Sequence, residues 1–206
     1  DYCSLNSSPE PLYLKELVAY TWKQMVNPRM LSGHLQGRFL AMISSLMRPS
    51  LVVEIGTFTG YSALCLAEGL APKGKVVTVE ANSEYAHKAK EFIDKTPLGG
   101  AVEVINQQGL DFIAGLENNS VDLVFIDADK VSYQNYFTAI KNKIRSSGLL
   151  IFDNVLWSEK VIDEEALKTD RDTRAMNEFN EFMKEQAGYE TLLLPMRDGL
   201  GLYRRK

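Results

Sequence analysis

Five short apolar runs alternate with helix-like segments between residues 51 and 152, and this alternation constrains the fold more than any other feature. Most of the runs are rich in Val, Ile, Leu or Phe and lack the polar alternation of a half-exposed strand, which is typical of parallel strands covered on both faces. Strands that alternate with helices predict an α/β fold built on a parallel sheet. The expected strands are residues 51–55, 75–79, 102–105, 121–126 and 149–152, and the expected helices between them are residues 61–70, 83–95 and 133–144.

The C-terminal segment breaks this alternation. A charged helix is expected over residues 174–186, followed by strands at residues 189–194 and 200–204. An Asp-Gly pair lies between the two strands, which predicts an antiparallel hairpin. The sequence therefore predicts a doubly wound, mostly parallel sheet of seven strands that ends in a C-terminal antiparallel hairpin.

The N-terminal segment carries apolar residues at helical spacing over residues 9–25 and 34–47, which predicts two helices. No linker or low-complexity segment interrupts the chain. We therefore expect a single domain over residues 1–206, in which the N-terminal helices of residues 1–48 cap the functional site.

Composition excludes several classes of protein. Hydrophobic residues make up 45% and charged residues 24% of the chain, which is typical of a globular protein and not of a disordered or collagen-like one. The net charge of −4 and the scattered basic residues argue against a nucleic-acid partner. The longest uncharged stretch, residues 55–67, is shorter than the roughly 20 apolar residues of a membrane span. Since Cys3 and Cys65 lack metal-ligand spacing and no secretory signal is recognisable, we expect a cytoplasmic protein.

Carboxylates stand at the ends of four of the five expected parallel strands: Glu54, Glu80, Asp127 and Asp153. In an open parallel sheet, ligands bind beyond the carboxyl ends of the strands. A carboxylate in such a place is also a common helix cap. Helix capping is therefore the alternative interpretation of Asp127 and Asp153.

Residues 54–62 combine a strand end, a glycine loop and the start of a helix. The glycines allow a ligand to approach the backbone, and a helix N-terminus favours an electron-rich group. Gly56 and Gly60 have the spacing G-x-x-x-G, which differs from the G-x-G-x-x-G pattern of dinucleotide sites. Glu80 ends the next strand, where a carboxylate can accept both hydroxyls of a ribose. A site that binds a nucleoside but has no pyrophosphate-binding loop indicates S-adenosylmethionine as the ligand. A nicotinamide cofactor is the alternative.

Asp127 and Asp153 also predict a metal site. If their strands are neighbours, about 4.8 Å apart, both carboxylates can bind one ion, and Asn154 adds an amide oxygen. Such hard ligands suit Mg²⁺, Mn²⁺ or Ca²⁺ rather than zinc. Lys130 would be a base if it were partly desolvated, or a surface lysine if it were not. Trp157 would either line the binding site of an aromatic substrate ring or pack in the protein core.

Four segments carry a resemblance to a known family: E-I-G-T-F-T-G-Y-S at 54–62, V-F-I-D-A-D-K at 124–130, F-D-N-V-L-W at 152–157 and L-P-M-R-D-G-L-G-L at 194–202. With these segments, in this order, the chain resembles the cation-dependent class I O-methyltransferases, which include caffeoyl-CoA and catechol O-methyltransferases and bacterial relatives. The resemblance implies a Rossmann-like methyltransferase fold and a homodimer. It also implies metal-dependent transfer of a methyl group from S-adenosylmethionine to a catechol-like phenol.

The resemblance assigns roles to particular residues. It implies Asp127 and Lys130 as catalytic residues and Asp127, Asp153 and Asn154 as metal ligands. The implied cofactor contacts are Ser32, Glu54, Gly56, Thr57, Ser62, Glu80, Asp127 and Asp129. The implied substrate contacts are Lys130, Asn154, Trp157 and Ser158.

Three alternatives stay open at this point. The same chemistry could methylate a hydroxylated uridine in tRNA, which the charge of −4 argues against. The chain could be a nicotinamide dehydrogenase, but it lacks the G-x-G-x-x-G pattern of that class. It could also be a non-catalytic binding domain, but such a domain would not need the intact group around Asp127 and Asp153. Ser158-Glu159 and Val131-Ser132 differ from plant members of the family, which argues against a coenzyme A thioester as the substrate.

Overall fold

The structure, a computed structural model, describes residues 2–206 and divides the chain into two compact units, Asp1–Gln108 and Gly109–Lys206. Asp1, the first residue of the expected single domain, lies outside the described residues. The single domain over residues 1–206, capped by its N-terminal helices, stays a prediction.

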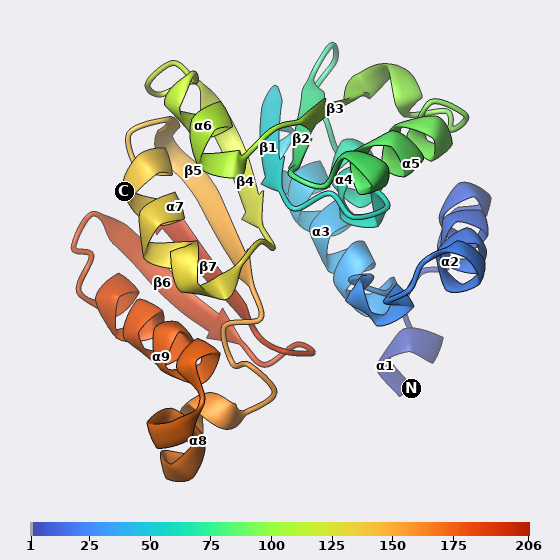
Figure 1. Cartoon of the computed structure of the whole chain (residues 1–206). Coiled ribbons are helices and arrows are strands. Elements are labelled where there is room, and N and C mark those ends of the chain that lie inside the picture. Colours follow the sequence, from blue (N-terminus) through green and yellow to red (C-terminus); the bar gives the residue numbers. More distant parts are fainter. Residues whose placement is uncertain (1) are drawn as a thin grey trace. The chain divides into compact units, whose positions relative to one another are not determined.

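The first unit contains three parallel strands, β1 (Leu51–Ile55), β2 (Lys75–Glu80) and β3 (Val102–Asn106), in the order β3-β2-β1. These strands are the ones predicted from the apolar runs, and β2 and β3 each extend one residue further. The register places Glu54 beside Thr78 on the neighbouring strand. The polar ends of β1 and β2 therefore lie at one edge of this part of the sheet (Figure 1).

The helical elements of the first unit are α1 (Tyr2–Leu5), α2 (Leu12–Gln24), η1 (Pro28–Met30), α3 (His34–Met47), α4 (Tyr61–Ala67), α5 (Ser83–Ile93) and η2 (Gly99–Ala101). The helix predicted over residues 34–47 is confirmed with its bounds. The helix expected from residue 9 begins at Leu12, because Pro11 is extended, with ψ 154°, and a proline disfavours a helical conformation in the residue before it. Helix α3 packs closely on α4, since a Cβ at Gly37 would lie 2.7 Å from the ring of Tyr61.

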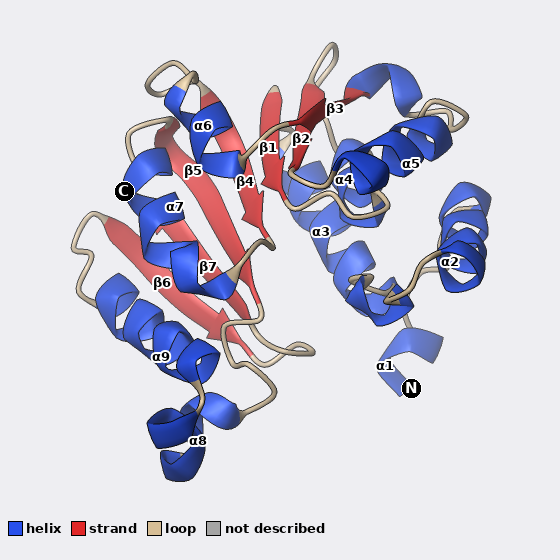
Figure 2. Cartoon of the chain, in the orientation of Figure 1, coloured by secondary structure: helices blue, strands red, loops and turns tan. Residues whose placement is uncertain are grey.

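The second unit contains β4 (Val121–Ile126), β5 (Ile144–Asp153), β6 (Tyr189–Leu194) and β7 (Leu200–Arg205), in the order β4-β5-β7-β6. Strand β5 pairs with β4 in parallel and with β7 in antiparallel orientation, and β6 and β7 form the predicted hairpin. The two units contain seven strands in all, drawn red in Figure 2. With the parallel strands of each unit and the C-terminal antiparallel hairpin, this confirms the predicted fold class.

Strand β5 is longer than its apolar run. It begins at Ile144, which pairs with Val121, and the register then shifts before Leu149 pairs with Leu123. The shift accommodates Ser147, whose φ is 63°. The helix expected to reach residue 144 therefore ends at Ile140.

The helical elements of the second unit are α6 (Gly109–Ala114), η3 (Lys130–Ser132), α7 (Tyr133–Ile140), η4 (Lys160–Ile162), α8 (Glu164–Thr169) and α9 (Arg171–Lys184). Figure 1 shows α7 and α9 in front of β5, β7 and β6. Their contact with the strands is aromatic: Phe179 of α9 lies 4.7 Å from Phe152 of β5, and Tyr133 of α7 lies 5.1 Å from it, centroid to centroid. This core fixes the end of β5, next to the carboxylates of interest.

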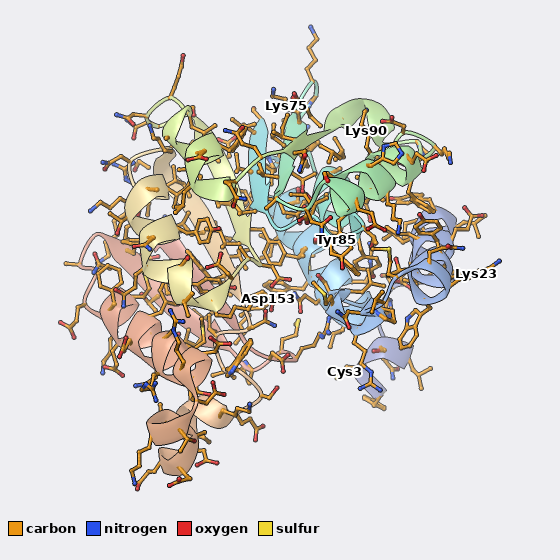
Figure 3. All side chains as sticks on the ribbon, viewed as in Figure 1. Cys3, Lys23, Lys75, Tyr85, Lys90 and Asp153 are labelled. Carbon is orange, nitrogen blue, oxygen red and sulfur yellow. The ribbon has the colours of Figure 1, made fainter. Side chains whose placement is uncertain are left out.

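Two of the compositional expectations can be compared with the structure. Cys3 is exposed on α1 (Figure 3) and Cys65 is buried, and both are free thiols. No helix in residues 2–206 combines the length and the apolar character that crossing a bilayer requires.

Candidate functional site

The glycine loop joins β1 to α4 in the first unit. Gly56 has φ 101° and Gly60 has φ 91°, a region of backbone space that favours glycine. A Cβ at Gly60 would also lie 2.6 Å from Cδ1 of Ile93. Both glycines are thus needed for the shape of the loop.

Glu80 ties this loop to the end of β2. One carboxylate oxygen accepts the backbone N–H of Phe58 and the other accepts that of Asn82, each at 2.9 Å. A carboxylate offers about four acceptor positions, so these two bonds leave room for two hydroxyl donors. The predicted ribose contact therefore fits Glu80, which also has a structural role that the sequence did not indicate.

Glu54 lies beneath the loop and is fully buried. Its Oε2 accepts a hydrogen bond from Thr78 Oγ1 at 2.5 Å, and that hydroxyl lies 2.6 Å from Thr57 Oγ1. A buried carboxylate is tolerated when it is hydrogen-bonded, and here the bonds connect it to the loop. Thr78 went unnoticed in the sequence, because nothing in an apolar strand marks one threonine as a partner of the glycine loop.

Two further predicted cofactor contacts, Ser32 and Ser62, are each 6% exposed. Ser62 lies in the first turn of α4, directly after the loop, and Ser32 lies just before α3. Their contact with a cofactor stays a prediction.

Asp127 directly follows β4 and Asp153 is the last residue of β5, the two parallel strands of the second unit. Ile126 of β4 pairs with Phe152 of β5, so the next residue along each strand is the acid (Asp153 is labelled in Figure 3). The N-cap residues of the helical turns that follow are Asp129, Ser132 and Glu159. Helix capping therefore does not explain Asp127 or Asp153, and the expected pairing of their strands is confirmed.

Asn154 holds a left-handed conformation, with φ 60°, which asparagine tolerates better than most residues. Its N–H donates to Asp153 Oδ1 at 2.7 Å. Both main-chain polar groups of the next residue, Val155, are hydrogen-bonded. Its N–H donates to Gly199 O at 3.1 Å, and its carbonyl oxygen accepts from Asn180 Nδ2 at 2.8 Å. Asn180 escaped the sequence analysis because it lies on α9, far from this loop along the chain.

Lys130 contacts the first of these acids. Its Nζ lies 2.7 Å from Asp127 Oδ1 and donates to the hydroxyl of Tyr133 at 3.0 Å. The Lys130 side chain is only 11% exposed and that of Asp127 is 25% exposed. The alternative of a solvated surface lysine is therefore wrong.

Tyr133 is the residue of this group that the sequence analysis missed. Its hydroxyl donates to the main-chain oxygen of Asp153 at 2.9 Å, and the whole side chain is buried. Burial, together with the charge of Asp127 and Asp153, raises the pKa of the Tyr133 hydroxyl well above its usual value, so it is neutral at ordinary pH. The neighbouring Tyr136 hydroxyl donates to Asp129 Oδ1 at 3.2 Å.

The loop after β5 carries the predicted substrate contacts Trp157 and Ser158. Trp157, Ser158 and Glu159 all have positive φ, at 48°, 53° and 64°. The hairpin turn supports them: Asp198 O accepts from Trp157 N–H at 3.2 Å, and Asp198 Oδ1 accepts from Ser158 Oγ at 3.0 Å. Trp157 Nε1 is a buried donor with no hydrogen-bond partner among residues 2–206. The indole is thus partly buried but not a satisfied core residue.

The oxygen atoms of Asp127, Asp153 and Asn154 are the hard ligands that Mg²⁺ or Ca²⁺ prefers. Within residues 2–206 there is no cluster of three His, Cys, Asp or Glu side chains that could hold a metal. A metal here would therefore need the amide oxygen of Asn154 as its third protein ligand. The donor set fits a hard cation and not zinc.

Comparison with known proteins gives consistent matches over nearly the whole chain. The model of the O-methyltransferase family matches residues 4–206. Caffeoyl-CoA O-methyltransferase 1 of Nicotiana tabacum is 32% identical over 209 residues, which covers 96% of this chain and 85% of the relative. A catechol O-methyltransferase of Niastella koreensis is 29% identical over 164 residues, covering 78% of this chain and 73% of the relative.

Two solved structures are similar throughout. The SAH-bound methyltransferase of Podospora anserina has a TM-score of 0.90 at 27% identity, covering 100% of this chain and 92% of that one. The Bacillus cereus O-methyltransferase in complex with SAH has a TM-score of 0.90 at 28% identity, covering 100% and 96%.

Proposed function

The chain belongs to the O-methyltransferase family, and on that premise we propose that it methylates a hydroxyl of a small catechol-like phenol with a divalent metal ion bound. As a family member it is an S-adenosylmethionine-dependent O-methyltransferase, which removes the dehydrogenase and the non-catalytic alternatives. The observation that carries the proposal is the partly buried ion pair of Lys130 with Asp127, which follows β4 and lies next to the end of the paired strand β5, where Asp153 stands.

The residues of the first unit bind the methyl donor in this proposal. Glu80 accepts the ribose hydroxyls, and the glycine loop leaves the backbone open to the ligand. The two solved relatives bound to SAH, the demethylated product of S-adenosylmethionine, support this choice of donor. The other residues of this unit assigned to the donor are Ser32, Glu54, Gly56, Thr57 and Ser62.

Asp127, Asp153 and Asn154 would hold the metal. When bound, a divalent cation supplies Lewis acidity that stabilises the negative charge of a phenolate. Asn180 and Gly199 fix the main chain of Val155, the residue directly after Asn154.

Lys130 acts on the phenol. The neutral amine form of Lys130 accepts the proton of the phenol hydroxyl at Nζ. The phenolate oxygen then bonds to the methyl carbon as the bond between that carbon and sulfur breaks. The positive sulfonium becomes a neutral thioether, and the methylated phenol carries no charge. The position of Nζ, 2.7 Å from Asp127, and its low exposure support this role.

Trp157 and Ser158 orient the acceptor ring. The hydrogen bonds to Asp198 give this loop a defined conformation. The relatives named for caffeoyl-CoA and catechol support a small phenolic acceptor, and they give no support to a tRNA uridine.

We also propose a homodimer formed through the N-terminal helices. Trp22 and Val26 near the end of α2, and Met42 and Leu46 on α3, expose large apolar side chains that favour contact with a partner surface. A monomer in sedimentation equilibrium at micromolar concentration would contradict this part of the proposal.

An acceptor screen tests the function. The purified chain is given S-adenosylmethionine and Mg²⁺ with catechol, caffeoyl-CoA or undermodified tRNA in parallel, and methyl transfer is measured. We expect methylation of the free catechol. Methylation of tRNA alone, or of no phenol, would contradict the proposal.

A further inference from the structure

We infer that Tyr133 is a positioning residue, which fixes Lys130 Nζ beside Asp127 by linking it to the main chain of Asp153. The inference rests on the proposed role of Lys130 in the reaction. The sequence showed Tyr133 only as the start of a helix.

The direction of the hydrogen bonds follows from the atoms present. Three polar atoms surround the Tyr133 hydroxyl: Asp153 O at 2.9 Å, Lys130 Nζ at 3.0 Å and Ile126 O at 3.4 Å. A hydroxyl has one proton, and a carbonyl oxygen only accepts. The proton therefore goes to the nearer carbonyl, Asp153 O, and the phenolic oxygen of Tyr133 accepts from Lys130 Nζ. The chain of bonds runs one way, from Lys130 through Tyr133 to Asp153.

The side chain of Tyr133 is held in place by its packing. Its ring packs edge-on against Phe152, at 5.1 Å and 62°, and against Phe179, at 5.3 Å and 79°. Tyr133 is 0% exposed, and protein interiors are packed as densely as organic crystals. The hydroxyl is therefore a fixed point to which a flexible side chain can be attached.

Lysine needs such a fixed point more than most residues. Its ammonium is a point charge on a flexible four-carbon stem. Here Asp127 Oδ1 and Tyr133 Oη hold Nζ from two sides, and Nζ also lies 5.2 Å from the centroid of the Tyr133 ring. Two directed bonds leave one remaining direction at Nζ for a substrate hydroxyl.

The same aromatic core offers a matched control. Tyr203 packs 5.8 Å from Phe152 and 6.1 Å from Phe179, and its buried hydroxyl has no hydrogen-bond partner in the described chain. Tyr203→Phe thus removes a buried hydroxyl from the core without touching Lys130. Tyr133→Phe keeps the ring and its packing, and it removes only the link.

The first test needs no activity. Lysines are acetylated briefly, and the rate at each site is measured by mass spectrometry, with the half-exposed Lys75 as internal reference. Loss of a hydrogen bond to a charged group predicts that Lys130 reacts on the order of tenfold faster in Tyr133→Phe, while Tyr203→Phe matches the wild type. Equal Lys130 rates in Tyr133→Phe and the wild type would overturn the inference.

The second test is a double-mutant cycle in the phenol assay. Tyr133→Phe should lower kcat about tenfold with an unchanged KM for S-adenosylmethionine, and it should have no further effect in a Lys130→Met background. An equal loss in both backgrounds would mean that Tyr133 acts through the fold, and would overturn the inference. A wild type that methylates no phenol would contradict the proposed function, and the acetylation rates would still decide the role of Tyr133.

Discussion

Replacing Glu80 by glutamine separates the two roles that the structure gives this side chain. Glutamine has the same shape, but it offers one acceptor oxygen and an NH₂ group in place of the second oxygen. One of the two backbone donors, Phe58 N–H or Asn82 N–H, must then lose its partner. The ribose hydroxyls also lose their charged acceptor.

The two losses have different magnitudes and different readouts. A hydrogen bond to a charged group contributes about 1.5–3 kcal/mol, so the affinity for S-adenosylmethionine should fall by roughly 10- to 150-fold. Loss of the partner of the partly buried Phe58 N–H costs about 1–2 kcal/mol of unfolding free energy. In a chain of this length that corresponds to a melting temperature lower by about 2–8 °C.

Titration calorimetry with S-adenosylmethionine and thermal unfolding measure these effects in the same preparation. Glu103→Gln is the matched control, since Glu103 lies on the adjacent strand β3 and its carboxylate forms an ion pair with the exposed Lys75. A folded Glu80→Gln variant that binds S-adenosylmethionine as tightly as the wild type would refute the ribose assignment. A variant with an unchanged melting temperature would refute the role of Glu80 in holding the loop.

Three further predictions concern other parts of the chain. Lys130→Ala should lower kcat about 10²- to 10⁴-fold in the phenol assay while calorimetry shows unchanged S-adenosylmethionine binding, and retention of most of the rate would show that Lys130 has no catalytic role. Gly37→Ala should lower the unfolding free energy by about 1–3 kcal/mol in urea titrations, because the added Cβ meets the ring of Tyr61 at 2.7 Å; an unchanged midpoint would contradict the close packing of α3 on α4. Burial and the nearby Glu68 raise the pKa of Tyr13 to about 12, so the stabilisation that depends on its protonation should be complete below pH 10 and lost as the pH rises towards 12, and Tyr13→Phe should flatten the stability profile over that window.

The parallel strands could be predicted from the sequence because their signal is local. Val121–Ile126 is an uninterrupted buried run, and its bounds agree with the structure. The end of β5 was predicted to within one residue, but its beginning was not, because Ser146, Ser147 and Gly148 interrupt the apolar pattern. Those residues lie where the register shifts between the pairs Val121–Ile144 and Leu123–Leu149, and no local pattern expresses such a shift.

The residues of the candidate site also fall into those with a local signal in the sequence and those without one. Carboxylates at strand ends could be identified, since the end of a strand is visible in the sequence and the chemistry belongs to the residue type. Thr78, Tyr133 and Asn180 could not, because their roles depend on register and packing. Thr78 reaches Thr57 only through the pairing of β1 with β2, and Tyr133 reaches Asp153 only because α7 packs on β5.

The dependence of catechol methylation on a divalent cation tests the central proposal most directly. Methyl transfer is measured for the wild type and for Asp153→Asn, with Mg²⁺ present, after exhaustive chelation, and after Mg²⁺ or Mn²⁺ is restored. Because Mg²⁺ requires hard oxygen ligands, we expect chelation to abolish the wild-type activity and added metal to restore it. Asp153→Asn should bind S-adenosylmethionine normally and stay inactive throughout. Full wild-type activity after exhaustive chelation would contradict the metal-dependent mechanism and the role assigned to Asp127, Asp153 and Asn154.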